Sequence, residues 1–160
     1  MAFVRVKKLK GKEYAYLVEN TWQDKGSRQK VKAYLGRVIK PLRQKEGLVD
    51  VAGMQFQDAV IALIKQELLN HGFGENLELE KVKADLLNKS FISGSRNVVL
   101  ALNEGFLCTH TITEVLDFKS AGYEEQVGAK LATALVEAGL KLPKDVFVAL
   151  FEKIYISNNN

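Results

Sequence analysis

The fold is decided first by residues 28–35, RQKVKAYL, in which two kinds of side chain alternate. One set of alternate positions holds Gln29, Val31, Ala33 and Leu35, and the other holds Arg28, Lys30, Lys32 and Tyr34. Because successive side chains of a β-strand point to opposite faces of a sheet, this pattern predicts a strand. We expect its first face to pack on the protein and its second face to carry three cations and an aromatic ring into water.

Two further runs complete a predicted three-stranded antiparallel meander over residues 1–40. Residues 3–9 are rich in Val, Lys and Arg, and residues 13–22 contain several aromatic and β-branched strand formers. The segments 10–12 and 24–27 separate the three runs, and each contains a glycine suited to a tight turn.

The remaining chain changes to a helical period. Residues 41–53, which include Pro41, Gly47 and Gly53, are predicted to connect the meander to a mainly helical domain over residues 54–157. Apolar stripes and capping residues predict five helices, at 54–71, 77–88, 111–118, 123–138 and from Pro143 onward. The expected fold class is therefore α+β.

Residues 97–108 interrupt the helical pattern. The β-like run 97–102 is followed by Asn103-Glu104-Gly105 and then by a second short apolar run. This arrangement predicts one β-hairpin within the helical domain. A helix is the alternative, because Leu and Ala are also good helix formers.

The composition is that of a globular protein with a core of its own. The chain has 160 residues, of which 47% are apolar, and its single cysteine, Cys108, excludes an internal disulfide. The N-terminus lacks an apolar run of the secretory kind, and no stretch approaches the ~20 apolar residues of a membrane span. We therefore expect a cytoplasmic protein with no membrane partner.

Positive charge is concentrated at the N-terminus. Residues 1–46 contain thirteen Lys or Arg and four Asp or Glu, whereas residues 47–160 contain ten and fifteen. Such asymmetry indicates a polyanionic partner, although a basic surface that only aids solubility gives the same pattern. The alternation of cations with aromatic residues favours nucleic acid.

The predicted function is therefore nucleic-acid binding through the meander. Duplex DNA is favoured over RNA, because a small β-sheet fits the DNA major groove. Tyr14, Tyr16, Trp22 or Tyr34 could instead stack on unpaired bases, although packing within the sheet is the commoner role of each ring. The predicted contact residues are Arg5, Lys7, Lys8, Arg28, Lys30, Lys32, Tyr34 and Arg37.

Residues 3–38 resemble a known kind of DNA-binding segment. The similarity lies in VRVKK at 4–8, GKEYAYLVE at 11–19, QKVK at 29–32 and YLGR at 34–37. It is to the N-terminal segment of insertion-sequence transposases and related archaeal proteins, and in pattern to the three-stranded arm-binding domains of tyrosine integrases. The resemblance implies that cations of the sheet face a DNA duplex. It implies no recombination chemistry, because the remaining chain departs from both families and lacks their catalytic residue sets.

Cys108 and His110, with Glu114 nearby, are the main candidates for catalytic or metal chemistry. A thiolate nucleophile needs an aligned base and an oxyanion hole, and residues two apart at a strand-to-helix junction seldom align in that way. Zinc normally needs four ligands in recognisable pairs, but the chain has two His and one Cys. We therefore expect a buried free thiol, no metal, no cofactor and no enzymatic activity.

A protein-interaction or oligomerisation module is the alternative function. The apolar faces at 123–135 and 146–154 could bury against a partner or form a homodimer through the C-terminal helices.

Overall fold

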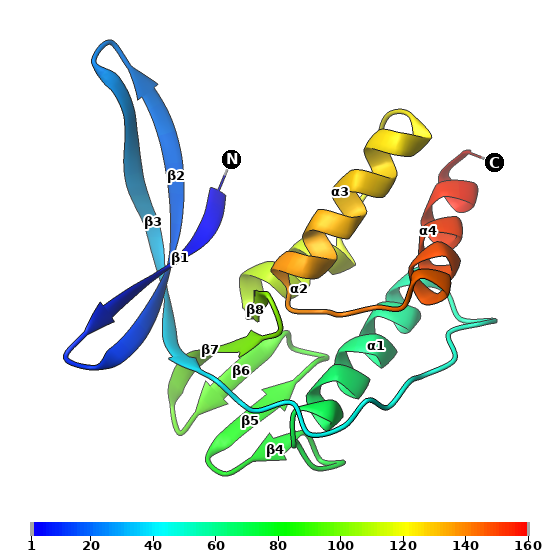
Figure 1. Ribbon diagram of the computed structural model, residues 1–160, viewed down its shortest axis with the longest axis horizontal. Helices are drawn as coiled ribbons and strands as arrows, with labels where there is room; N and C mark the ends of the chain where they lie inside the picture. Colours follow the sequence, from blue (N-terminus) through cyan, green and yellow to red (C-terminus); the bar gives the residue numbers. More distant parts are fainter. Residues whose placement is uncertain (1, 160) are drawn as a thin grey trace.

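One mixed sheet runs through this α+β protein, and a computed structural model describes it over residues 2–159, with side chains described as far as Ile156 (Figure 1). The strands are β1 Ala2–Leu9, β2 Lys12–Gln23, β3 Gly26–Ile39, β4 Glu78–Leu79, β5 Val82–Asp85, β6 Ser90–Ser93, β7 Arg96–Leu102 and β8 Gly105–Leu107. The helices are α1 Phe56–Asn70, α2 Thr109–Leu116, α3 Glu124–Glu137 and α4 Lys144–Asn159.

The predicted meander is confirmed, and its last strand also pairs with the rest of the sheet. β1 pairs antiparallel with β2, and β2 pairs antiparallel with β3. β3 then pairs in parallel with β7, where residues 37–39 lie beside residues 98–100. The strand order is β1-β2-β3-β7-β6-β5-β4, with β8 also on β7.

Gly36 allows β3 to approach β7 closely. Its φ is +140°, and a Cβ at this position would lie 2.5 Å from the backbone oxygen of Asn97. A side chain would therefore meet backbone atoms that cannot rotate away, and only glycine adopts this φ without strain. The glycine thus fixes the place where the meander joins the body of the protein.

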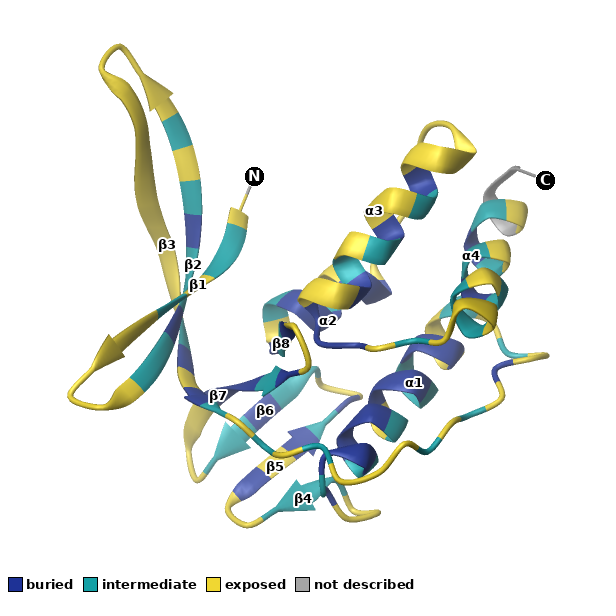
Figure 2. Cartoon of the chain, viewed as in Figure 1, coloured by how far each residue is buried: buried dark blue, intermediate teal, exposed yellow. Residues whose placement is uncertain are grey.

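Two hydrophobic clusters lie on the sheet. The larger one packs all four helices on β5 to β8, and its fully buried members include Phe91, Ile64, Leu131 and Leu150 (Figure 2). The smaller one joins the meander to β7 and β8 through Ala15, Val38, Val99 and Cys108. The base of the meander is therefore held by its own small core.

A buried polar cluster holds the connector, residues 40–55, against α1. The carboxylate of Glu67 is 4% exposed, and its Oε1 accepts hydrogen bonds from Arg43 and, at 2.9 Å, from Asn103. The ring of His71 lies beside it, with Nδ1 3.5 Å from Oε1. Hydrogen bonding to Glu46, together with the charges of Glu67 and Glu46, raises the pKa of the Arg43 guanidinium.

Several sequence predictions are confirmed and one helix is wrong. Helix α1 forms as predicted. The predicted hairpin also forms from β7 and β8, with its turn at residues 103–104. The helix predicted at 77–88 is absent, because this segment contains β4 and β5. Val82, Ala84 and Leu86 are buried while the residues between them are less so, which is the period of a strand. The second half therefore contains five strands, more than the single predicted hairpin.

None of the helices within residues 2–159 combines the length and the apolar composition needed to cross a membrane.

Candidate nucleic-acid interface

The outer halves of β2 and β3 form a ribbon that projects from the rest of the protein (Figure 1). Every residue from Trp22 to Tyr34 is exposed, which covers the end of β2, the turn and both faces of the outer part of β3, whereas Glu19 and Thr21 of β2 are half-buried (Figure 2). The prediction that Gln29, Val31 and Ala33 pack on the protein is therefore wrong. Only the base of the ribbon reaches a core, so packing does not force alternation on its outer part.

Two β-bulges in β3 change which side chains share a face. Tyr16 pairs with Tyr34 and Ala15 with Gly36, while Leu17 pairs with Ala33 and Val18 with Val31. β3 therefore holds one extra residue in each of two places, at Lys32 and at Leu35. Each extra residue reverses the alternation of the side chains that follow.

Directly paired residues share a face of a sheet, so the register assigns each side chain to one of two faces. The core-side face holds Val4, Val6, Lys8, Glu13, Ala15, Leu17, Glu19, Thr21, Arg28, Lys30, Ala33 and Gly36. The tyrosine face holds Phe3, Arg5, Lys7, Tyr14, Tyr16, Val18, Asn20, Trp22, Gln29, Val31, Tyr34 and Arg37. The prediction that Tyr34 shares a face with Arg28 and Lys30 is wrong, because the bulge at Lys32 lies between Lys30 and Tyr34.

Carboxylates accompany the cations on the core-side face. Lys32 reaches this face and lies 3.0 Å from Glu19, and Lys40 lies 2.9 Å from Glu13. The hydrogen bond and the charge of Lys32 lower the pKa of Glu19 below its ordinary value. Arg28 and Lys30 lie farther out on the ribbon, opposite Thr21 and Glu19.

Three aromatic rings cluster on the tyrosine face. The Tyr34 ring centroid is 5.2 Å from that of Tyr16 and 6.4 Å from that of Tyr14, and both pairs are tilted. The Nζ atom of Lys7 lies over the Tyr16 ring, 5.2 Å from its centroid. Tyr34 is still 57% exposed, so its neighbours cover only part of its ring.

The cations of the tyrosine face have no carboxylates among them. Within β1, β2 and β3, which the structure describes in full, both acidic residues lie on the core-side face. Arg5 donates a hydrogen bond to the side-chain oxygen of Gln29 on the same face. Partial burial and the neighbouring Tyr16 and Tyr14 raise the pKa of Tyr34, so its ring is neutral at neutral pH.

Arg96 joins this face although the sequence did not indicate it. Arg37 pairs with Val98 of β7, and Arg96 is two residues before Val98, so it lies on the same face of the sheet. Its positive charge acts on the Tyr34 phenol, where it favours the ionised form. Arg96 is far from the basic segment in sequence, and only the β3–β7 pairing brings it near.

The structure therefore divides the predicted contact residues into two groups. Those on the tyrosine face are Arg5, Lys7, Tyr34 and Arg37. Those on or reaching the core-side face are Lys8, Arg28, Lys30 and Lys32.

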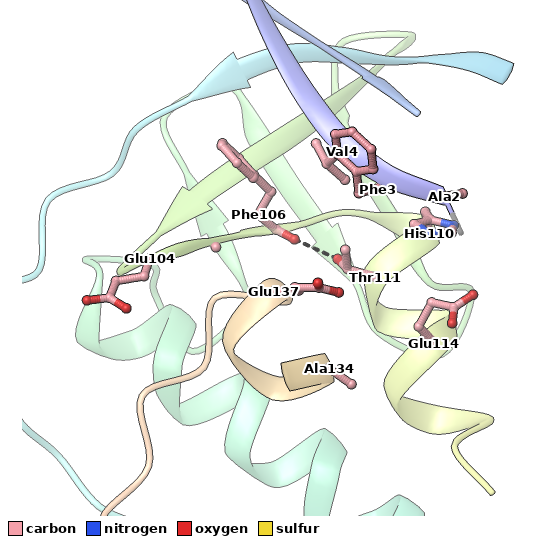
Figure 3. A pocket seen from close by; sticks show the side chains of 11 residues that line it. Ala2, Phe3, Val4, Glu104, Phe106, His110, Thr111, Glu114, Ala134 and Glu137 are labelled. Carbon is pink, nitrogen blue, oxygen red and sulfur yellow. Dashed lines mark hydrogen bonds between the residues drawn. The ribbon is translucent and has the colours of Figure 1, made fainter. Parts of the chain in front are cut away.

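A separate pocket lies between the start of β1 and helices α2 and α3 (Figure 3). It has a volume of about 260 Å³ and adjoins a second hollow of about 480 Å³. His110, Glu114 and Glu137 line both hollows. In the wall, Thr111 Oγ1 donates a 2.6 Å hydrogen bond to the backbone oxygen of Phe106.

Cys108 does not share this pocket with His110. The thiol is buried in the small core, with Sγ 3.7 Å from Thr111 Oγ1, which confirms the expected buried free cysteine. The pairing of thiol and imidazole considered from the sequence is not formed. Among the described side chains, no three His, Cys, Asp or Glu residues form a group that could hold a metal ion.

Comparison with known proteins finds no matching family, no matching curated protein and no matching solved structure.

Proposed function

We propose that this protein binds nucleic acid without catalysing a reaction, and that cations of the meander contact phosphates. The observation that carries the proposal is the projecting ribbon, exposed on both faces from residue 22 to residue 34. This segment contains four Lys or Arg and one Asp.

Exposure and charge together favour a polyanion as the partner. An outer ribbon that buries no apolar face contributes little to the stability of the core, so its length and composition need another explanation. Lys and Arg that neutralise phosphates release condensed counterions, which is the main source of sequence-independent affinity.

Duplex DNA is the first ligand to test. A two-stranded ribbon has the width to enter the major groove, where the side chains of one face reach bases and phosphates. Arg28 and Lys30 lie on the outer ribbon and would contact phosphates. The exposed pair of Lys32 and Glu19 is no obstacle, because surface ion pairs contribute only about 0–1 kcal/mol.

A salt titration tests this proposal. Trp22 is the only tryptophan and is 85% exposed on the ribbon, so its fluorescence reports on a ligand bound there. We expect the logarithm of the duplex affinity to fall linearly with the logarithm of salt concentration. The double variant Arg28→Ala, Lys30→Ala should reduce this slope by about 2, because each phosphate contact contributes about 0.9.

A matched control removes the same charge from the body of the protein. Lys119 and Lys144 are both exposed and lie outside the meander. The variant Lys119→Ala, Lys144→Ala should bind as the wild type does. Duplex affinity that is absent at 50 mM salt, or that does not depend on salt, would reject contact between the meander and duplex phosphates.

The alternative function, an interaction module built on the C-terminal helices, has less structural support. The predicted apolar stripes are largely used within the chain, since Leu131, Leu135, Leu150 and Ile154 are all buried. Val136, Val148 and Ile156 are exposed. A homodimer through these helices stays a prediction, and sedimentation of the wild type tests it.

A further inference from the structure

The tyrosine cluster is more open than a packing role requires. Aromatic residues that pack in a hydrophobic core are usually buried, as Phe91 is. Tyr34 is more than half exposed, and its ring contacts those of Tyr14 and Tyr16. None of the three tyrosines belongs to either hydrophobic cluster.

The surroundings of this cluster fit a strand of phosphates. Arg5, Lys7, Arg37 and Arg96 lie on the same face, and β1 to β3 place no carboxylate among them. The Tyr34 phenol, whose pKa is raised by burial and its tyrosine neighbours, adds no negative charge. An anion beside the rings would thus meet positive charge without the repulsion present on the core-side face, where Glu13 and Glu19 lie.

Rings flanked by cations match the chemistry of unpaired bases. A base outside a duplex offers a free aromatic face that stacks on a tyrosine ring, while cations contact the backbone on either side. Bases within a duplex are already stacked on one another and offer only their edges. An exposed aromatic ring such as that of Tyr34 therefore discriminates in favour of single strands.

We infer that the tyrosine face, with Tyr34 at its centre, stacks unpaired bases, so that the preferred ligand is a single-stranded nucleic acid. This inference rests on the proposed function, because Arg5, Lys7 and Arg37 among the cations that hold the backbone belong to the same meander. It adds a class of ligand and assigns separate roles to the two faces.

Three labelled probes separate base stacking from phosphate contact. They are a single strand of mixed sequence, an abasic strand with the same number of phosphates, and the corresponding duplex, each measured by fluorescence anisotropy at one salt concentration. The wild type should bind the normal single strand roughly tenfold more tightly than the abasic strand, as expected for stacking of at least one base.

Substitutions of Tyr34 test the residue. Tyr34→Leu should weaken binding of the normal single strand roughly tenfold and leave binding of the abasic strand unchanged. Tyr34→Phe should retain wild-type affinity, because stacking needs the ring and not the hydroxyl. Tyr123 is 80% exposed at the start of α3, so Tyr123→Leu is the matched control and should have no effect.

The outcomes distinguish this inference from the proposed function. Equal affinity for normal and abasic strands, or an unchanged Tyr34→Leu variant, would overturn stacking while salt-dependent binding still supported phosphate contact. No salt-dependent binding of any probe would overturn both. If Tyr34→Leu instead changed only the oligomeric state in sedimentation, the face would serve contact between copies and the inference would be wrong.

Discussion

The outer ribbon and the body of the protein use β-structure in opposite ways. In β5 to β8, alternate side chains pack beneath the helices, and residues such as Phe91 and Leu100 are almost wholly buried. Between residues 22 and 34, the same backbone conformation leaves every side chain exposed. Under the proposed function, stability therefore resides in the body and binding in the ribbon, so that substitutions in one region should leave the other property unchanged.

The largest expected effect is in the body. Phe91→Ala removes a fully buried ring from the larger cluster, and such substitutions cost about 3–5 kcal/mol of unfolding free energy. Urea denaturation measures the loss. Nucleic-acid affinity per folded molecule should stay at the wild-type value, and a parallel loss of affinity would break the separation.

The buried polar cluster should give the next largest effect. Glu67→Ala removes the buried carboxylate that pairs with Arg43 and accepts a hydrogen bond from Asn103. Arg43 is left with the exposed Glu46 as its carboxylate partner, and breaking a buried ion pair costs about 3 kcal/mol or more. Exposed Glu46 also contacts Arg43, at 2.8 Å, and Glu46→Ala is the control, with a cost within about 1 kcal/mol. Similar costs for the two variants in urea denaturation would show that burial of Glu67 is unimportant.

Shortening the ribbon should have a small effect on stability. Glu19 and Lys30 are direct partners, so Asn-Gly in place of residues 20–29 would close the hairpin with a tight two-residue turn. We expect the unfolding free energy to change by less than about 1 kcal/mol, because the removed residues bury little. Salt-dependent binding should weaken, because Lys25 and Arg28 are removed. A loss of several kcal/mol in urea would show that the ribbon supports the core.

The smallest effect concerns the acid side of the pH profile. Lys32 lowers the pKa of Glu19 in the folded protein. A carboxyl of this kind stabilises the fold at pH values above its ordinary pKa. That contribution is lost as the pH falls through the pKa of the folded state. Lys32→Met should return the Glu19 pKa toward 4.5, as measured by NMR titration of the side-chain carbon. Asp85 is the internal reference, because its pKa is lowered by Asn88 and should not move.

Local patterns predicted most of the elements, but not the faces of the ribbon. The meander, α1 and the β7–β8 hairpin follow from alternation, apolar stripes and turn residues. The bulges at Lys32 and Leu35 depend on how β3 meets β2 and β7, and a one-residue shift reverses every following side chain. For this reason the sequence predicts the strand that holds Arg28 and Lys30, but its prediction that Tyr34 shares their face is wrong.

Longer-range pairing explains what else the sequence did not reveal. Arg96 reaches the tyrosine face only because β3 and β7 are neighbours, and nothing near residue 96 indicates that partnership. The segment 77–88 contains enough Leu and Lys to suggest a helix, yet burial against α1 and β6 favours very short strands. Both cases depend on contacts between segments distant in sequence.

β3 is one continuous strand that is exposed to solvent at its start and buried near its end. Its outer residues are exposed, whereas Val38 near its end is buried in the small cluster. Amide hydrogen exchange should therefore slow progressively along these fourteen residues, from local fraying at the ribbon tip to opening of the whole molecule beside Val38. A ligand held on the ribbon would be connected to the body through one continuous strand, with no separate linker between them.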